Sequence, residues 1–149
     1  MLNKRRQARE LAVRALYAHE MSGNPVDSII DEMIQTTGEE PATKQFAAAL
    51  VRASIKEKAQ IEKLIVRQAH NWDFDRIAIL DKICMRMAIA ELLCFEDIPP
   101  KVTIDEAIEI SKKYSTERSS HFVNGILDGV LTYLRRKGLL NKKGRGLQE

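Results

Sequence analysis

The chain has 149 residues, of which 30% are charged and 5% aromatic, and its formal net charge is +3. This length is that of one domain with a continuous core, so we expect no second catalytic module, and the weak charge permits a polyanionic partner without requiring one. No run of about 18 apolar residues is present and the start is charged, so we expect a soluble cytoplasmic protein without a membrane segment.

The first predicted helix covers about residues 4–22 and has two sides of opposite character. Small and apolar residues share one side, which can pack on a core: Ala8, Leu11, Ala12, Ala15 and Leu16. The other side carries Arg6, Arg9, Val13 and Tyr17. It would place cations and one ring in solvent, which predicts binding of a phosphate chain with unstacked bases.

The first turn of this helix is basic, with Lys4, Arg5 and Arg6 in sequence. Cations at a helix start oppose the helix dipole and destabilise the helix slightly. A local rule that is broken without visible compensation favours polyanion binding here over simple solubility.

Helical periodicity continues along the chain, and no stretch keeps the period of a strand. The later predicted helices cover about residues 26–35, 43–70, 74–95, 101–114 and 121–136. We expect a bend near Lys56–Lys58, and we expect the helix over 74–95 to be central because it is apolar on most sides. The pattern predicts one all-α domain over residues 1–138, a compact bundle of six to seven helices, followed by a basic, disordered tail over 139–149.

No cluster of side chains predicts catalysis or a metal site. Cys84 and Cys94 lie in apolar runs without a ligand partner, so we expect buried free thiols. The carboxylates of Asp105, Glu106 and Glu109 have the spacing of a solvated helix face with lysine partners. We therefore expect a protein that is not an enzyme and that holds no metal or cofactor.

Two aromatic residues have both a structural and a binding interpretation. Trp72 stands at a helix junction, where a large ring most often wedges two elements together, so we favour the structural role. Phe122 lies at the edge of the last helix's apolar stripe. It either caps the core or presents its ring to a base, and its position alone favours the core.

Five groups of residues occur in a recognisable order over nearly the whole chain. They are Lys4–Glu10 with Ala15–Tyr17, Trp72 with Arg76, Cys84–Ala88 with Glu91–Leu92, Pro99–Glu109, and Phe122–Asp128. The last two are the most specific. Together the five resemble the NusB family of bacterial transcription antitermination factors.

The resemblance implies a fold of two small helical subdomains without catalytic activity. It implies binding of boxA-type single-stranded RNA together with NusE, a ribosomal small-subunit protein, and action with other Nus factors on RNA polymerase in ribosomal RNA operons. The implied RNA contacts are Arg5, Arg6, Arg9, Tyr17, Arg86, Lys101, Phe122 and Asn124. The implied protein-partner residue is Asp81, and self-association into a homodimer is left open.

Four positions differ from the family pattern. Gln7 removes a cation of the first cluster, and Arg118 places a positive charge where the family has a negative one. Ala90 replaces an aromatic residue, and Asp105 replaces an asparagine. We expect these changes to affect the affinities for RNA and NusE.

Two other functions fit the sequence less well. One is a helical protein-interaction module without RNA binding, which mixing with labelled RNA would distinguish. The other is the NusB-like domain at the front of some ribosomal RNA cytosine methyltransferases, which would require a following catalytic domain. If the RNA-binding hypothesis holds and about four phosphates are neutralised, the logarithm of affinity falls with log salt at a slope of roughly −3.

Overall fold

A computed structural model describes residues 4–148, and all regular structure in this part of the chain is helical. Its α-helices are α1 (Lys4–Ser22), α2 (Val26–Ile30), α3 (Pro41–Lys56), α4 (Lys58–Gln68), α5 (Ile79–Cys94), α6 (Pro100–Tyr114) and α7 (Glu117–Arg136). Three shorter turns complete it: η1 (Asp31–Gln35), η2 (Phe74–Arg76) and η3 (Gly144–Leu147). The all-α class and the number of helices are confirmed. None of the helices in residues 4–148 is long and apolar enough to cross a membrane.

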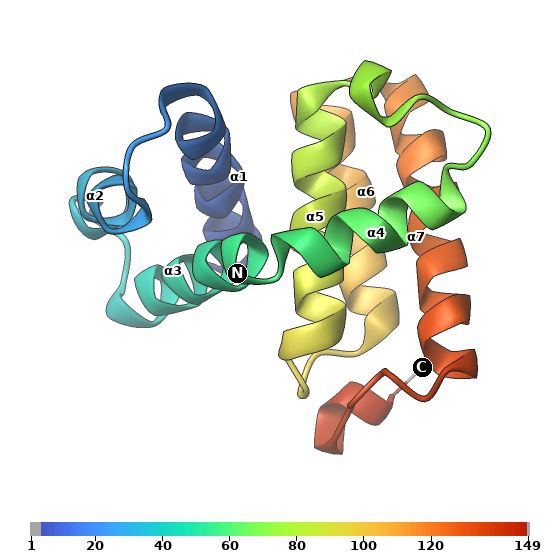
Figure 1. Ribbon diagram of the computed structural model, residues 1–149. Coiled ribbons are helices and arrows are strands. Elements are labelled where there is room, and N and C mark those ends of the chain that lie inside the picture. Colours follow the sequence, from blue (N-terminus) through green and yellow to red (C-terminus); the bar gives the residue numbers. More distant parts are fainter. Residues whose placement is uncertain (1–3, 149) are drawn as a thin grey trace.

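The helices form two groups that share α5. Figure 1 shows α1, α2 and α3 on one side of α5, with α4, α6 and α7 on the other. Each group has its own apolar core, and α5 contributes Ile83 and Met87 to the first and Met85 and Ile89 to the second. The prediction of two small subdomains around a central helix is confirmed, because a helix buried on both sides must be apolar on both.

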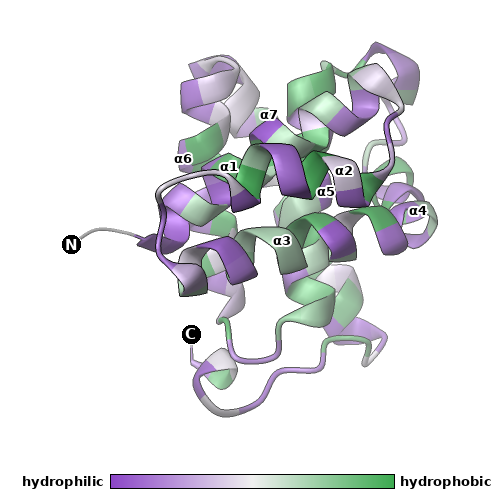
Figure 2. Ribbon diagram, turned by 90° about the vertical axis from the view of Figure 1, so that its left-hand side faces the viewer, coloured by the Kyte–Doolittle hydropathy of each residue, from purple (hydrophilic) through white to green (hydrophobic). Residues whose placement is uncertain are grey.

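The amphipathic helices of the first group turn their apolar sides inward. Figure 2 shows hydrophobic and hydrophilic residues alternating along α1 and α3. The predicted core side of α1 is buried in full: Ala8, Leu11, Ala12, Ala15 and Leu16. The helix ends at Ser22. The following Gly23 adopts a φ of 71° and donates its N–H to the carbonyl of His19, which closes the last turn.

The long helix predicted over residues 43–70 is divided at Glu57. α3 ends at Lys56 and α4 begins at Lys58, so the predicted bend is confirmed as a break. The two helices run one after the other, with α3 in the first group and α4 in the second (Figure 1). At its far end α4 is tied to α7, where the Arg67 guanidinium lies 4.2 Å from the centre of the Tyr133 ring.

The central helix begins later than predicted. Residues 74–76 form a separate 3₁₀ turn, because the side chain of Asp73 accepts a hydrogen bond from the N–H of Asp75 at 3.1 Å. Ile77 and Ala78 are then extended, and α5 starts at Ile79. The capping role predicted for Asp73 is confirmed, but it caps the short turn and not α5.

The tail lies against the end of α5, in contrast to the predicted disorder. The Lys142 Nζ donates hydrogen bonds to the carbonyls of Phe95 and Glu91 at 2.8 and 3.2 Å. The N–H of Lys143 donates to the carbonyl of Glu96 at 3.0 Å. Carbonyls at and just beyond the end of a helix can accept further donors, and the tail supplies them here. Of the predicted domain over residues 1–138 and the predicted tail over 139–149, residues 1–3 and 149 lie outside the residues that the structure describes.

Candidate nucleic-acid interface

Arg9, which the sequence places on a solvent-facing side, is only 3% exposed. Its Nε and Nη2 donate to the two carboxylate oxygens of Glu91 at 2.6 and 2.9 Å, and Thr103 donates to the same carboxylate at 2.8 Å. Val13, one turn further along α1, is buried as well. The predicted exposure is therefore wrong for Arg9 and Val13, which pack against the neighbouring helices, and it holds for Tyr17, which is 40% exposed.

The other cations at the start of α1 differ in their partners. Arg6 forms a bidentate pair with Glu106, with both N···O distances at 2.8 Å, and Lys4 pairs with Glu40 at 2.7 Å. The hydrogen bond from Arg6 lowers the pKa of Glu106, and the same bond raises the pKa of Arg6. Distant carboxylates therefore compensate the basic first turn, which the sequence alone did not indicate.

Arg5 is the exposed cation of this turn that keeps its charge available. Its guanidinium lies 4.3 Å from the centre of the Phe46 ring, and within residues 4–148 no carboxylate is at ion-pair distance from it. Such a cation–π contact orients the guanidinium without neutralising it. Arg5 is therefore better placed than Arg6 or Arg9 to bind a phosphate.

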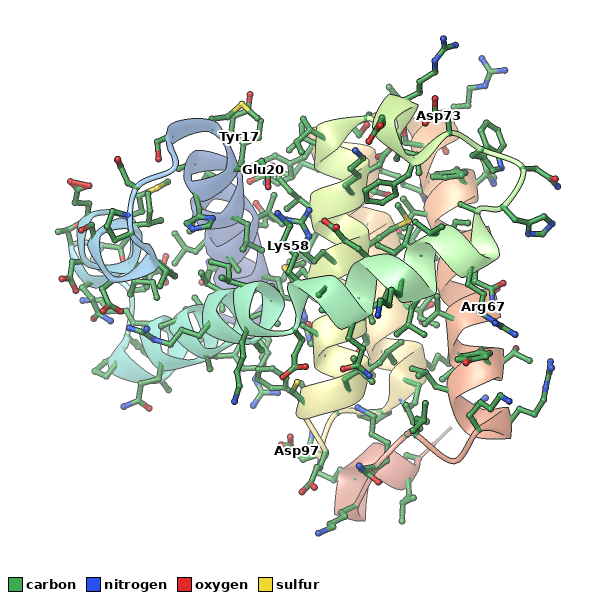
Figure 3. The ribbon with its side chains drawn as sticks, in the orientation of Figure 1. Tyr17, Glu20, Lys58, Arg67, Asp73 and Asp97 are labelled. Atoms are coloured by element: carbon green, nitrogen blue, oxygen red, sulfur yellow. The ribbon has the colours of Figure 1, made fainter. Side chains whose placement is uncertain are left out.

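Arg5 and Arg9 line a hollow of about 460 Å³. It is bounded by α1, by the connection between α5 and α6, and by the tail, which contributes Arg145. Figure 3 shows Asp97 of that connection at the same end of the molecule as the tail. The hollow thus brings together cations from the two ends of the described chain.

A second hollow of about 470 Å³ lies on the other side of α6, between α6 and α7. Lys101 and Asn124, two of the implied RNA contacts, line it together. Lys101 is exposed, and in the described part of the chain no carboxylate pairs with it. The replaced position Asp105 also lines this hollow, where its carboxylate reduces the positive potential.

Phe122 lines a third hollow of about 540 Å³ near the turn η2. Its ring is half-buried on the second core and meets the Trp72 ring edge-on, with the centres 5.1 Å apart. Trp72 is 62% exposed, so the prediction that it wedges two elements together is wrong for most of its ring. Arg76 and Arg118 lie at the same hollow. Arg76 is 3.8 Å from the carboxylate of Asp73, so within residues 4–148 Arg118 is the cation without an ion-pair partner beside the rings.

Asp81 also lines this hollow, although it is only 5% exposed. Within residues 4–148 its Oδ1 has no hydrogen-bond partner. A buried carboxylate oxygen without a donor is costly, so a donor on a bound molecule would be favourable there. The Asp81 carboxylate is therefore reached through the hollow and is not itself exposed on the surface.

Tyr17 is far from the arginines at the other end of α1. It is 40% exposed and lines an apolar hollow of about 380 Å³ with Met33, Leu80 and Tyr114. Figure 3 shows Tyr17 near the end of α1, beside Glu20. Tyr17 and Arg5 are separated by about 18 Å of helix, at 1.5 Å per residue. The side of α1 predicted as one ligand-binding surface is thus divided into two sites.

Arg86 is 4% exposed and lies at the junction of the two groups of helices. It approaches Glu20 of α1 and Glu62 of α4 at 3.4 and 3.3 Å, while Lys58 lies 4.0 Å from both carboxylates. Glu20 and Lys58 meet at this junction in Figure 3. Arg86 therefore holds α1, α4 and α5 together, and its side chain is not on the surface that the RNA-contact role implied by the resemblance would require.

The two cysteines differ in burial. Cys84 is buried as predicted, and burial raises the pKa of its thiol to about 12. Cys94 is exposed, so the prediction for this residue is wrong. The described residues contain no group of three or more side chains that could hold a metal ion.

Comparison with known sequences places the chain in a family. The NusB family pattern matches residues 6–132. The transcription antitermination protein NusB of Salinibacter ruber is 44% identical over 147 residues, which cover 98% of this chain and 92% of the relative. The protein of the same name from Chloroherpeton thalassium is 45% identical over 148 residues, covering 99% and 70%.

Solved structures agree with this placement. NusB of T. maritima has a TM-score of 0.80 and 37% identity, covering 89% of this chain and 93% of that one. A structure of antitermination factors NusB and NusE in complex with dsRNA has a TM-score of 0.80 and 22% identity, and the match covers 89% of this chain and 99% of that one. NusB from Aquifex aeolicus has a TM-score of 0.78 and 21% identity, and the match covers 99% of this chain and 100% of that one. The last two likenesses concern the fold alone, and the sequence matches establish that the chain belongs to the NusB family.

Proposed function

We propose that this protein is a non-enzymatic, RNA-binding transcription antitermination factor. It binds boxA-type single-stranded RNA together with NusE and acts with other Nus factors on RNA polymerase in ribosomal RNA operons. Family membership supports the proposal, as does the structure of NusB and NusE with dsRNA, whose NusB has the same fold. The observation that carries it is the pair of hollows on either side of α6, with Arg5 in one and Lys101 with Asn124 in the other.

The exposed cations act on the phosphates. Arg5 and Lys101 contact the RNA backbone from the two sides of α6, and Arg6 adds part of its charge while bound to Glu106. Each neutralised phosphate of a single strand contributes about −0.7 to the slope of log affinity against log salt, so about three phosphates give a slope of roughly −2. Asn124 supplies an amide that both donates and accepts hydrogen bonds with the sugar or a base.

The rings contact the bases. Phe122 and the exposed Trp72 form a stacking platform, and Arg118 beside them holds a neighbouring phosphate. Tyr17 lies too far from Arg5 to share one phosphate with it and contacts a more distant part of the RNA or of the NusE complex. Arg9 and Arg86 act as positioning residues, because both side chains are buried in ion pairs.

NusE docks at the start of α5 in this proposal. Leu80 lines the apolar hollow of Tyr17, and the neighbouring Asp81 lines the hollow of Phe122. A protein partner that covers both hollows would bury the apolar one and supply a donor to Asp81. The RNA would then run over the Phe122 end of α7 next to NusE.

The test is a titration of labelled boxA-type RNA, with and without NusE, at several salt concentrations. We expect binding that weakens with salt, and a loss of about tenfold in the Arg5→Gln, Lys101→Gln double variant, because two exposed phosphate contacts disappear. Lys63→Gln, an exposed cation on α4 outside these hollows, is the matched control and should bind normally.

Absence of RNA binding at low salt, combined with retained NusE binding, would identify a protein-interaction module and reject the proposal. Sedimentation of the free chain tests the homodimer at the same time. If a dimer forms, RNA should compete with it only when the dimer covers the hollows of Arg5 and Lys101.

A further inference from the structure

The tail is attached to the end of α5 by specific contacts, although the family match ends at residue 132. The Lys142 ammonium is half-buried and donates to the carbonyls of Phe95 and Glu91. Burial lowers the pKa of this ammonium, despite the carboxylates around it. A lysine that gives up hydration is held in place by these carbonyls, so residue 142 anchors the tail.

Gly146 shows that the tail fits closely at a second point. It is buried, and a Cβ at this position would overlap the carbonyl oxygen of Glu96. The turn η3 around it is closed by a hydrogen bond from the Gly146 N–H to the carbonyl of Lys143 at 2.9 Å. Only glycine permits this approach of two backbones. The position of the tail against the end of α5 therefore depends on two of its own residues, Lys142 and Gly146.

The consequence of this path is the position of Arg145. Between the two attachment points, the tail turns so that Arg145 lines the hollow that also contains Arg5. Arg145 is exposed, and within residues 4–148 no carboxylate is at ion-pair distance from it. The wall between the two arginines includes Pro99 and Val102, which offer no competing charge. Two carboxylates also line the hollow. Glu106 is bound to Arg6, and within residues 4–148 Asp97 pairs with no cation.

We infer that the docked C-terminal tail completes the RNA-binding hollow, with Arg145 and Arg5 binding backbone phosphate from opposite sides. The inference rests on the proposed function and extends it to a segment beyond the family match. Phosphodiesters fit the hollow because they are anionic acceptors without donors, and guanidinium groups bind them through paired N–H donors. A tail that acted only as a mobile polycation would need neither Gly146 nor the anchor at Lys142.

Three variants separate position from charge, with boxA-type single-stranded RNA as the probe. Arg145→Gln removes the charge inside the hollow, and we expect affinity to fall about threefold and the salt slope to become shallower by about 0.7. Lys143→Gln removes one charge from the same tail outside the hollow, where the lysine side chain is 76% exposed and its ammonium lies 3.8 Å from Glu96, and affinity should not change. Gly146→Val keeps every charge but prevents docking, and it should lose as much affinity as Arg145→Gln.

Hydrogen exchange of the Lys143 N–H reports docking without RNA, because this group is bonded to the carbonyl of Glu96. We expect protection in the parent protein and in Arg145→Gln, and fast exchange in Gly146→Val. Equal losses for Arg145→Gln and Lys143→Gln, with Gly146→Val unaffected, would overturn the inference while leaving the proposed function intact. Failure of the parent protein to bind RNA would reject the proposed function, even with the Lys143 N–H protected, and the role of Arg145 with it.

Discussion

Arg9 of α1 and Glu91 of α5 form a bidentate ion pair whose side chains are 3% and 1% exposed. The pair is completed by Thr103 of α6, which donates to the same carboxylate. Three helices from both groups are therefore joined at one buried carboxylate. A charge in such a position is tolerated only when its hydrogen bonds are satisfied, so each member depends on the others.

The first prediction concerns Arg9. Arg9→Ala leaves the Glu91 carboxylate buried without its cation, and we expect the free energy of unfolding to fall by about 3–5 kcal/mol. Arg5→Ala, which removes an exposed cation from the same helix turn, should cost less than about 1 kcal/mol. Urea denaturation followed by circular dichroism measures both. Equal, small losses would mean that the Arg9 pair is open to water.

Because Arg9 is buried in this pair, a substitution there changes stability first and is a poor test of RNA binding. The sequence identifies an arginine on a helix and its neighbours at helical spacing, but it does not show which distant carboxylate meets it. Glu91 is 82 positions away from Arg9, and the partner of Arg6 is 100 positions away. Ion pairs between helices depend on how the helices pack, so local periodicity could not predict them.

The second prediction concerns acid stability and the Arg6–Glu106 pair. The bond from Arg6 lowers the folded-state pKa of Glu106 below its ordinary 4.5. The stabilisation is therefore present above pH 4.5 and is lost as the pH falls below it through the folded-state pKa. Glu106→Gln should cost about 1 kcal/mol at pH 7, because the pair is partly exposed.

Unfolding curves from pH 7 to about pH 3 test this assignment. The difference between the parent protein and Glu106→Gln should shrink as the pH falls below the ordinary pKa of a glutamate. Glu109→Gln, which removes an exposed carboxylate of the same helix, serves as the control and should give a small difference at every pH. A Glu106 difference that stayed constant into acid would show that the loss has another cause.

Periodicity predicted the helices and the central place of α5, because burial of an apolar side is a local property of the sequence. It also predicted the core side of α1 correctly. It failed where a polar group is buried against another helix, as at Arg9. The basic composition of the tail likewise did not reveal that Lys142 would find carbonyl acceptors at the end of α5. Five of the implied RNA contacts reach the surface in a hollow: Arg5, Tyr17, Lys101, Phe122 and Asn124.

The third prediction concerns the junction at Arg86. Arg86→Ala would leave Glu20 and Glu62 facing each other with only Lys58 nearby, and we expect a loss of about 2–4 kcal/mol. In a Glu20→Gln, Glu62→Gln background this loss should be clearly smaller, because the repulsion and the ion pairs are both absent. A double-mutant cycle by urea denaturation gives the coupling energy. Strict additivity would mean that Arg86 acts through packing alone.

The last prediction uses Trp72, the only tryptophan of the chain. Its ring is 62% exposed and meets Phe122 edge-on, so it reports on the third hollow without a label. If bases stack there, boxA-type RNA should change the Trp72 emission and protect it from acrylamide quenching. Trp72→Ala should reduce RNA affinity by about fivefold, as stacking contributes roughly 1–3 kcal/mol per base, yet cost little stability.

Phe122→Ala should reduce both RNA affinity and stability, because its ring also packs on the second core. RNA binding that left emission and quenching unchanged would place the bases elsewhere, and the RNA would then be held by the cations beside α6 alone.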